Sequence, residues 1–518
     1  MKLRALPLIL ALYGAPVLAA GPVNFPADLP SILPMLPPLP TQLIPDPMQA
    51  MQMALRYYQM AANAGDAEAQ TKMGLVFEQG LGVGKDIAEA ARWYERAAAQ
   101  NEPTGLYNLG LLLLKGQGGT PDAERAAQLM TGAAELNLAA AQSQLALMHE
   151  KGLGVPASPE LAAFWTRRAA ELGDVPAQNN MGIKLAYGQG VKADYAEAVK
   201  WFTKAAEAGN AEAQGNLGLI YKDGLGGVKQ DFLSAANWMA LAGSQGHVAS
   251  QSRLAWMFEK GQGLPKNMTE AARWFQMAAE AGDAPAATHL GWLYETGALG
   301  NPVGKPDLVA ALGWYQRAAA GNDATAQNNL GRLYREGRGV AADAAQARTW
   351  FLKAAAQNEP LAWYNLGLMT EQGQGVEKSE AEALDWYRKA AEKNVAAAQS
   401  RLGWLMHKSG KAEEAVSWLT KAAEAGDIAA QNNLGVIFEQ GKGAAKDPVA
   451  AAKWYRRAAE AGDKVAQHNL GVLYRDGIGV EKNEAEALAW FQKSADQGYA
   501  KAQLNLGQLF EKQAGQKK

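Results

Sequence analysis

The chain contains 518 residues, with 50 lysines and arginines against 52 aspartates and glutamates, and it contains no cysteine. The resulting formal net charge of −2 argues against a broadly basic surface that binds nucleic acid. The lack of cysteine excludes disulfide scaffolds, cysteine nucleophiles, cysteine-ligated zinc and lipidation on cysteine.

Residues 1–20 are predicted to be a secretory signal peptide. Lys2 and Arg4 precede an apolar run over residues 6–18, and small residues that fit a cleavage site follow it. No later stretch approaches 18 consecutive apolar residues, so we expect no transmembrane segment in the mature chain. These features predict a periplasmic or secreted protein that is not a lipoprotein. The alternative is an uncleaved anchor that lies in the membrane interface.

Residues 21–47 form a proline-rich segment. Such a composition is typical of a semi-rigid spacer of polyproline type rather than of a packed core. Leucine, isoleucine and methionine residues alternate with the prolines, so a docking peptide for a partner is the second interpretation.

Residues 48–513 repeat one sequence of about 36 residues, which is the signature of a stacked array. A tryptophan or leucine marks a second register, 17 residues before the next Leu-Gly step, so changes in repeat length fall between the two markers. The spacing predicts twelve full repeats with half a repeat at each end, followed by a polar tail over residues 514–518. The Leu-Gly step, with small variants, recurs at Gly74, Gly110, Ala146, Gly182, Gly218, Ala255, Gly291, Gly331, Gly367, Gly403, Gly435, Gly471 and Gly507.

Each repeat is predicted to consist of two helices, as over residues 324–336 and 343–357. Gly337 can end the first helix in the left-handed conformation. Between repeats, pairs such as Gly426-Asp427 supply a glycine that ends one helix and an acid that caps the next. Eleven of the 15 tryptophans share one register in the second helix, where repetition predicts core packing between repeats.

The Leu-Gly-x-x-Tyr sequence, as in residues 213–221, resembles the tetratricopeptide motif. The period of 36 and the Gly-x-Gly-Val loop, as in residues 371–376, resemble Sel1-like repeats. This resemblance implies an all-α fold, a right-handed superhelical α-solenoid of antiparallel helix pairs, that serves as a scaffold or adaptor. The loop is missing at residues 406–411 and expanded at residues 297–305, and we expect both places to change the local curvature.

No constellation of residues predicts catalysis, a cofactor site or a metal site. The five histidines lie at different registers, and none has a second metal-type residue at a reliable spacing. The loop over residues 80–86 has the wrong glycine spacing for a P-loop and an aspartate where serine or threonine is required. The markers of acyl-enzyme chemistry, G-x-S-x-G and S-x-x-K, are absent from the sequence.

The resemblance also supplies a candidate binding site. In tetratricopeptide-like solenoids the first helices form the concave face, through positions three before and one after the glycine of the Leu-Gly step. These positions lie four apart and share one helix face, so they are predicted to line a groove for an extended peptide or a partner helix. Alternatively, supercoiling buries this stripe between repeats. The candidate residues are Tyr107, Trp256, Trp292, Arg332, Tyr364 and Trp404.

The sequence therefore predicts a non-catalytic, exported scaffold without a cofactor, which binds a protein or peptide in envelope assembly or at a host interface. A glycan-binding envelope protein, for peptidoglycan or an exopolysaccharide, is the first alternative, because exposed tryptophan and tyrosine rings can stack on sugars. A hydrolase is the second alternative, and it would need an acid–base cluster that the sequence does not reveal.

Overall fold

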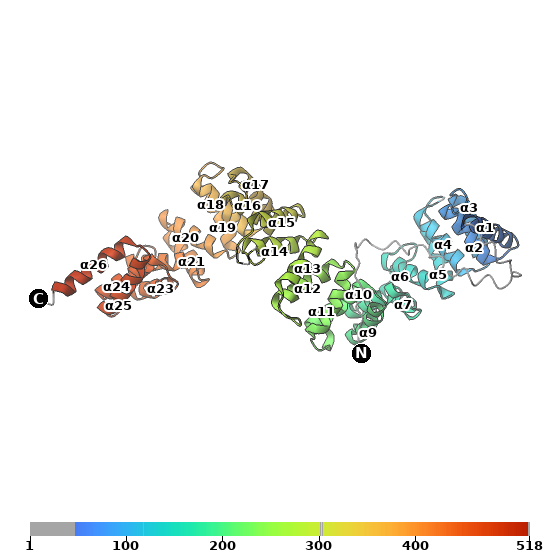
Figure 1. The fold of residues 1–518 in the computed structure, drawn as a ribbon, viewed down its shortest axis with the longest axis horizontal. Coiled ribbons are helices and arrows are strands. Elements are labelled where there is room, and N and C mark those ends of the chain that lie inside the picture. Colours follow the sequence, from blue (N-terminus) through green and yellow to red (C-terminus); the bar gives the residue numbers. More distant parts are fainter. Residues whose placement is uncertain (1–46, 118, 301, 303, 516–518) are drawn as a thin grey trace. The chain divides into compact units, whose positions relative to one another are not determined.

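The computed structural model describes residues 47–117, 119–300, 302 and 304–515, and all regular structure in these ranges is helical (Figure 1). The all-α prediction is therefore confirmed. The predicted signal peptide 1–20 and residues 21–46 of the proline-rich segment lie outside the described residues, as do residues 516–518 of the tail. Among the described helices, none combines the length and the apolar character that a membrane span requires.

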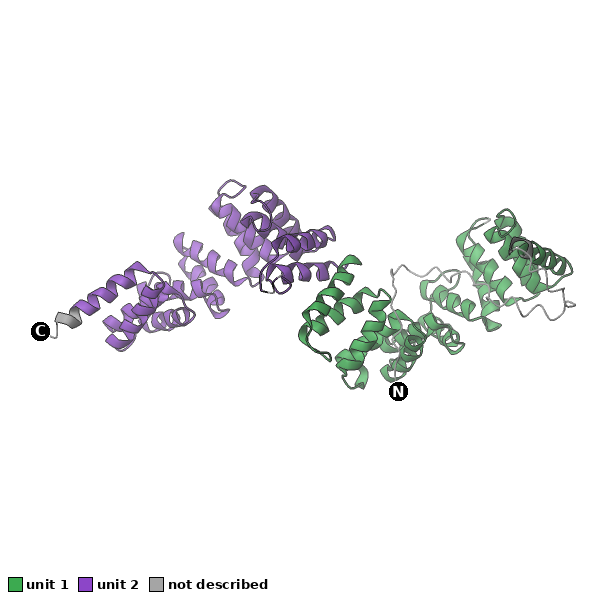
Figure 2. Cartoon of the chain, viewed as in Figure 1, with its two compact units in different colours: residues 1–281 green, residues 282–518 purple. Residues whose placement is uncertain are grey.

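The chain divides into two compact units, and unit 1 extends to Ala281 (Figure 2). A short 3-10 turn, Leu225–Gly227, follows α10. The α-helices of unit 1 are α1 (Pro47–Asn63), α2 (Ala67–Gln79), α3 (Ile87–Ala98), α4 (Pro103–Lys115), α5 (Ala123–Glu135), α6 (Ala139–Lys151), α7 (Pro159–Glu171), α8 (Val175–Tyr187), α9 (Tyr195–Glu207), α10 (Ala211–Asp223), α11 (Phe232–Ser244), α12 (Val248–Lys260) and α13 (Met268–Glu280).

Unit 2 begins at Gly282 and repeats the same arrangement. Its last helix continues to Gly515, two residues into the predicted polar tail. The helices of unit 2 are α14 (Ala284–Glu295), α15 (Leu308–Ala320), α16 (Ala324–Glu336), α17 (Ala344–Ala356), α18 (Pro360–Gln372), α19 (Glu380–Glu392), α20 (Ala396–Lys408), α21 (Ala412–Glu424), α22 (Ile428–Gln440), α23 (Pro448–Glu460), α24 (Lys464–Asp476), α25 (Glu484–Asp496) and α26 (Ala500–Gly515).

The even-numbered helices are the first helices of the repeats and the odd-numbered helices are the second helices. Each first helix packs most extensively on the second helix of its own repeat, and within each unit each second helix packs on the next first helix. Helix α1 is a second helix that precedes the first full repeat, and α26 is a first helix that follows the last one (Figure 1). The array therefore consists of paired helices that contact only their neighbours.

Most helices end at the predicted glycines and begin at the predicted capping acids. Gly337 ends α16 in the left-handed conformation, with φ of 66°. Gly426 has φ of 93°, and the Asp427 carboxylate accepts a hydrogen bond from the backbone N–H of Ala430 at 2.7 Å, which caps α22. Asparagine takes the left-handed role of glycine between some repeats, because its short side chain tolerates this conformation. These positions are Asn101, Asn137, Asn322, Asn358 and Asn394.

The glycine of the Leu-Gly step makes room for a large side chain of its own repeat, an aromatic ring in most repeats, and we call this contact the glycine seat. A Cβ at Gly331 would lie 2.6 Å from the Phe351 ring, and a Cβ at Gly367 would lie 2.6 Å from the Tyr387 ring. Both rings are fully buried. The residue after the second-helix tryptophan, rather than the tryptophan itself, therefore fills this space.

The tryptophans of the second-helix register lie at the edge of the core. Trp93 and Trp201 are buried, whereas Trp350 and others are only half-buried. A basic side chain three residues later commonly covers the indole, as Lys353 does, with its Nζ 4.1 Å from the ring centroid of Trp350. The register is thus partly core and partly a cation-covered surface.

Glutamines connect successive repeats. The Gln399 side chain donates to the carbonyl oxygen of Ala391 at 3.0 Å, and the Gln467 side chain donates to that of Ala459 at 3.1 Å. In both cases the first helix is tied to the end of the preceding second helix. First helices also approach one another directly, in the pairs α2 and α4, α10 and α12, α16 and α18, and α20 and α22. Their closer approach places the first helices on the inner side of the curve within each unit.

Candidate functional site

The residue one after the Leu-Gly step is at least partly exposed to solvent on each first helix. In most repeats this residue is a half-buried aliphatic side chain, such as Leu75, Ile183 or Val436. Three repeats carry tryptophan instead, and these rings are 41% (Trp256), 48% (Trp292) and 38% (Trp404) exposed. Large exposed indoles at a register otherwise occupied by shielded aliphatic residues form a surface available for contact.

The position three before the glycine has a different environment. The Asn328 side chain accepts a hydrogen bond from the Asn365 amide of the next first helix at 2.9 Å, and Asn179 accepts one from Asn216 at 3.1 Å. This position therefore faces the neighbouring repeat. The two registers do not form one exposed groove, which corrects the expectation from their spacing of four residues.

Tyr107 and Tyr364 both lie at this inter-repeat position. Tyr107 is only 5% exposed and packs in the core formed around Met130 and Leu145. Tyr364 is half-buried, and its ring centroid lies 5.9 Å from that of Tyr387. Burial raises the pKa of both tyrosines. Tyr107 is therefore removed from the candidate site, and Tyr364 is retained only at its margin.

The exposed tryptophans have aromatic and basic neighbours. Trp292 stacks on His289, with ring centroids 5.4 Å apart and an angle of 23° between the rings. Trp404 lies 5.9 Å from the His407 ring. In unit 1, Trp256 contacts the edge of Phe275 at 5.2 Å, and Lys260 lies 5.5 Å from its ring centroid. Each indole contacts residues of its own helix or repeat and stays partly exposed.

Arg332 occupies the same register but forms part of a charged cluster. Its guanidinium lies 2.6 Å from the Glu295 carboxylate, which Arg338 also contacts at 2.9 Å. The Tyr315 hydroxyl donates to the same carboxylate at 2.9 Å. Glu336 also contacts both arginines, at 3.7 and 3.5 Å, so two carboxylates face the two guanidinium groups. Arg332 is therefore a paired charge between two repeats and not a free cation.

A second cluster lies two repeats further along unit 2. Arg401 makes two hydrogen bonds to Glu371, at 2.7 and 2.9 Å, and the Tyr387 hydroxyl donates to Glu371 at 2.7 Å. Burial alone would raise the pKa of Glu295 and of Glu371. Hydrogen bonds and charge from the arginines outweigh burial, so both pKa values are lowered. Both carboxylates are consequently ionised at neutral pH.

Sequence reasoning missed Glu295, Glu371 and Arg401. A detectable signal exists, because the glutamate four residues after the glycine occurs in every full repeat whose second helix carries tyrosine after the tryptophan register. The resulting tyrosine–glutamate bonds join Tyr94 to Glu78, Tyr315 to Glu295, Tyr387 to Glu371 and Tyr455 to Glu439. Aligning the repeats with one another reveals this pairing.

Acidification is expected to lower the free energy of unfolding of unit 2, because Glu295 and Glu371 become protonated. Their folded pKa values lie below 4.5, the value of an unperturbed glutamate. The stability they contribute is therefore complete above about pH 4.5 and is lost as the pH falls through the folded values. Urea unfolding at neutral pH and at about pH 3 measures this loss. In the variant Glu371→Gln the pH dependence should shrink, and an unchanged dependence in that variant would contradict the assignment.

The charged residues of this face serve structure. Within the described ranges, no three histidine, aspartate or glutamate side chains are grouped so as to hold a metal ion. The carboxylates of the two clusters are held by arginine and tyrosine. The arrangement therefore offers exposed aromatic surface, bordered by neutralised charge, for contact with another molecule.

Stacked helix pairs of about 36 residues define an α-solenoid repeat protein. A glycine seat packs each pair internally, and glutamine side-chain hydrogen bonds join it to the preceding pair. The chain belongs to the Sel1 repeat family, as the sequence resemblance predicted. Sel1 repeats match residues 47–66, 67–102, 103–138, 139–174, 175–210, 211–247, 248–283, 284–323, 324–359, 360–395, 396–427, 428–463 and 464–499.

One solved structure supports the same family. The chain is similar to a protective antigen present in uropathogenic Escherichia coli strains that displays an SLR fold. The identity is 33%, the match covers 88% of this chain and 90% of that chain, and the TM-score is 0.63. A Sel1 repeat protein from Oxalobacter formigenes is 27% identical over 68% of this chain and 94% of that chain, with a TM-score of 0.41. No curated protein matches the chain significantly.

Proposed function

We propose that this Sel1-like repeat scaffold binds an extended protein or peptide segment along the first-helix face of unit 2. The observation that carries the proposal is the exposure of Trp292 and Trp404 at one register of this face, and Trp256 occupies the same register separately in unit 1. Indole rings supply large contact areas at low entropic cost and dominate many protein interfaces. A rigid array spends little free energy on ordering itself, so small contacts in several repeats can add up.

Trp292→Ala and Trp404→Ala are each expected to weaken partner binding about tenfold while leaving helicity unchanged, since 48% and 38% of these side chains are exposed. The measurement is binding of peptides selected from a displayed random library, with circular dichroism as the folding check. Val449→Ala is the matched control, because Val449 is exposed on a second helix, α23. Unfolding of the tryptophan variants would show that these rings are core.

A glycan ligand is the second candidate, favoured by the same exposed indole faces, which can stack on sugar rings. Co-sedimentation with peptidoglycan sacculi or an exopolysaccharide separates the two candidates. Binding to the polysaccharide that Trp292→Ala abolishes, without selection of any peptide, would replace the protein-binding proposal.

The proposed place of action is the periplasm or the cell exterior. Support comes from the predicted signal peptide 1–20, and a protective antigen among the relatives agrees with it. Fractionation of cells, with the N-terminal sequence of the recovered protein, tests this proposal. Recovery of an uncleaved chain from the cytoplasm would refute it.

A further inference from the structure

Helix α1 is a second helix whose first helix is missing from the described array. In the next repeat, Ala90, Tyr94 and Ala97 are fully buried against their own first helix. The matching residues in α1, 36 positions earlier, are Ala54, Tyr58 and Ala61, and all three are only half-buried. The face that normally receives a first helix is therefore incompletely covered.

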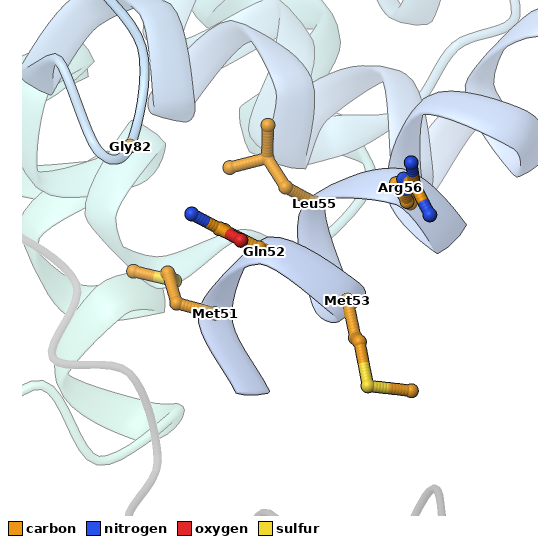
Figure 3. A pocket seen from close by; sticks show the side chains of 6 residues that line it. All are labelled: Met51, Gln52, Met53, Leu55, Arg56 and Gly82. Atoms are coloured by element: carbon orange, nitrogen blue, oxygen red, sulfur yellow. The ribbon is translucent and has the colours of Figure 1, made fainter. Parts of the chain in front are cut away.

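The start of α1 is also loosely packed. In other repeats the second loop glycine presses on the start of the preceding second helix, and a Cβ at Gly154 would lie 1.9 Å from the carbonyl oxygen of Ala123. A Cβ at Gly82 would have only Leu55 within 4 Å. A pocket opens here, and Met53 points away from Gly82 (Figure 3). Exposed methionines at this end leave an adaptable apolar surface.

Helix α26 is a first helix that no second helix of its own repeat covers among the described residues. Its glycine seat is empty, since a Cβ at Gly507 would meet no atom within 4 Å. At Gly471, one repeat earlier, a Cβ would lie 2.8 Å from the Phe491 ring. Phe510 is 49% exposed, and Leu506 is half-buried although the matching residue in every full repeat is buried.

The polar residues at the two ends also match. Tyr58 occupies the register of Tyr387, and within the described residues its hydroxyl has no hydrogen-bonding partner. Glu511 occupies the register of Glu371 on a first helix. Lys72 occupies the register of Arg401, and its Nζ lies 5.3 Å from the centroid of the Tyr58 ring. The two ends together thus hold the acid, the tyrosine and the cation of the cluster around Glu371.

We propose that the partner for these ends is a second copy of this chain. Helix α26 of one copy docks on α1 of the next and completes a full repeat. The Tyr58 ring of one copy enters the glycine seat at Gly507 of the other. The Glu511 carboxylate accepts a hydrogen bond from the Tyr58 hydroxyl and forms an ion pair with Lys72. This contact joins two different surfaces head to tail, so it propagates into a chain of copies or closes into a ring.

Sedimentation velocity over a concentration series tests the proposal on the purified chain. We expect concentration-dependent growth beyond the monomer. Gly507→Leu should raise the dissociation constant at least tenfold, because the added side chain occupies the place of the Tyr58 ring. The substitution meets open space in the single copy, so its helicity should be unchanged or higher. A wild-type chain that stays monomeric up to its solubility limit would overturn the proposal.

A charge exchange provides an independent check. Glu511→Lys or Lys72→Glu alone should each weaken association, and the double variant should recover most of it because the pair is restored with opposite polarity. If the double variant did not recover association, the proposed ion pair between Glu511 and Lys72 would be refuted. Any loss of fold would appear in both single variants by circular dichroism and would not be rescued.

Mixing distinguishes head-to-tail contact from a symmetric dimer. A Gly507→Leu chain retains an intact α1, and a Tyr58→Ala chain retains an intact α26. Each variant alone should stay monomeric, whereas their mixture should form a 1:1 dimer that grows no further. Larger assemblies from either variant alone would refute this interface.

Discussion

Gly367→Leu is expected to destabilise unit 2 by about 3 kcal/mol. A Cβ at this position would lie 2.6 Å from the Tyr387 ring, well inside the contact distance. The ring cannot move aside freely, because it is fully buried and its hydroxyl is bound to Glu371 at 2.7 Å. Urea unfolding followed by circular dichroism measures the loss, and in a repeat array the transition of unit 2 should broaden as well.

Gly313→Leu is the matched control in the same unit. Gly313 lies in α15, and a Cβ there would meet no atom within 4 Å. Leucine favours the helix over glycine, so this variant should gain up to about 1 kcal/mol. An equal loss from both substitutions would show that glycine acts through the backbone rather than through the seat.

Glu295→Ala is expected to cost about 2 kcal/mol. The carboxylate is 8% exposed and holds Arg332, Arg338 and the Tyr315 hydroxyl. Its removal leaves the hydroxyl without its acceptor and leaves both arginines with only the longer contacts to Glu336, at 3.7 and 3.5 Å. The arginines retain partial access to water, at 28% and 37% exposure, and this places the cost below that of a fully buried pair.

The control for the charged cluster is Asp385→Ala in α19. Asp385 pairs with Arg388 at 3.3 Å and is 71% exposed, so its loss should change the free energy of unfolding by less than about 0.5 kcal/mol. Urea unfolding of both variants at neutral pH makes the comparison. If Asp385→Ala cost as much as Glu295→Ala, burial of the cluster would not explain its contribution.

The helices could be predicted from the sequence because the same markers recur in every repeat. The expected first helix over residues 324–336 coincides with α16, and the second, expected over residues 343–357, is one residue shorter at each end in α17. Asp343 is the cap rather than a helical residue there, since its carboxylate accepts from the backbone of Gln346 at 2.9 Å. Repetition averages out the local ambiguity that a single helix would show.

The candidate site could be predicted only in part. The exposed register was identified through Trp256, Trp292 and Trp404, but exposure at the three-before register depends on the next repeat. Tyr107 is buried because a neighbouring first helix covers it, and the curvature that sets this distance is not encoded in one repeat. Arg332 was expected to face a partner, but its acid lies 37 residues earlier, in the preceding repeat.

The uniform capping of the repeats has a consequence at the level of the gene. If residues 428–463 were excised in frame, Asp427 would precede Lys464 and could cap α24 as Asp463 does now. The deletion would remove both Tyr455 and Glu439, so neither the hydroxyl nor the carboxylate would remain without its hydrogen-bonding partner. Recombination between homologous copies can therefore shorten or lengthen the coding region by whole modules, and natural length variants should differ by multiples of about 36 codons.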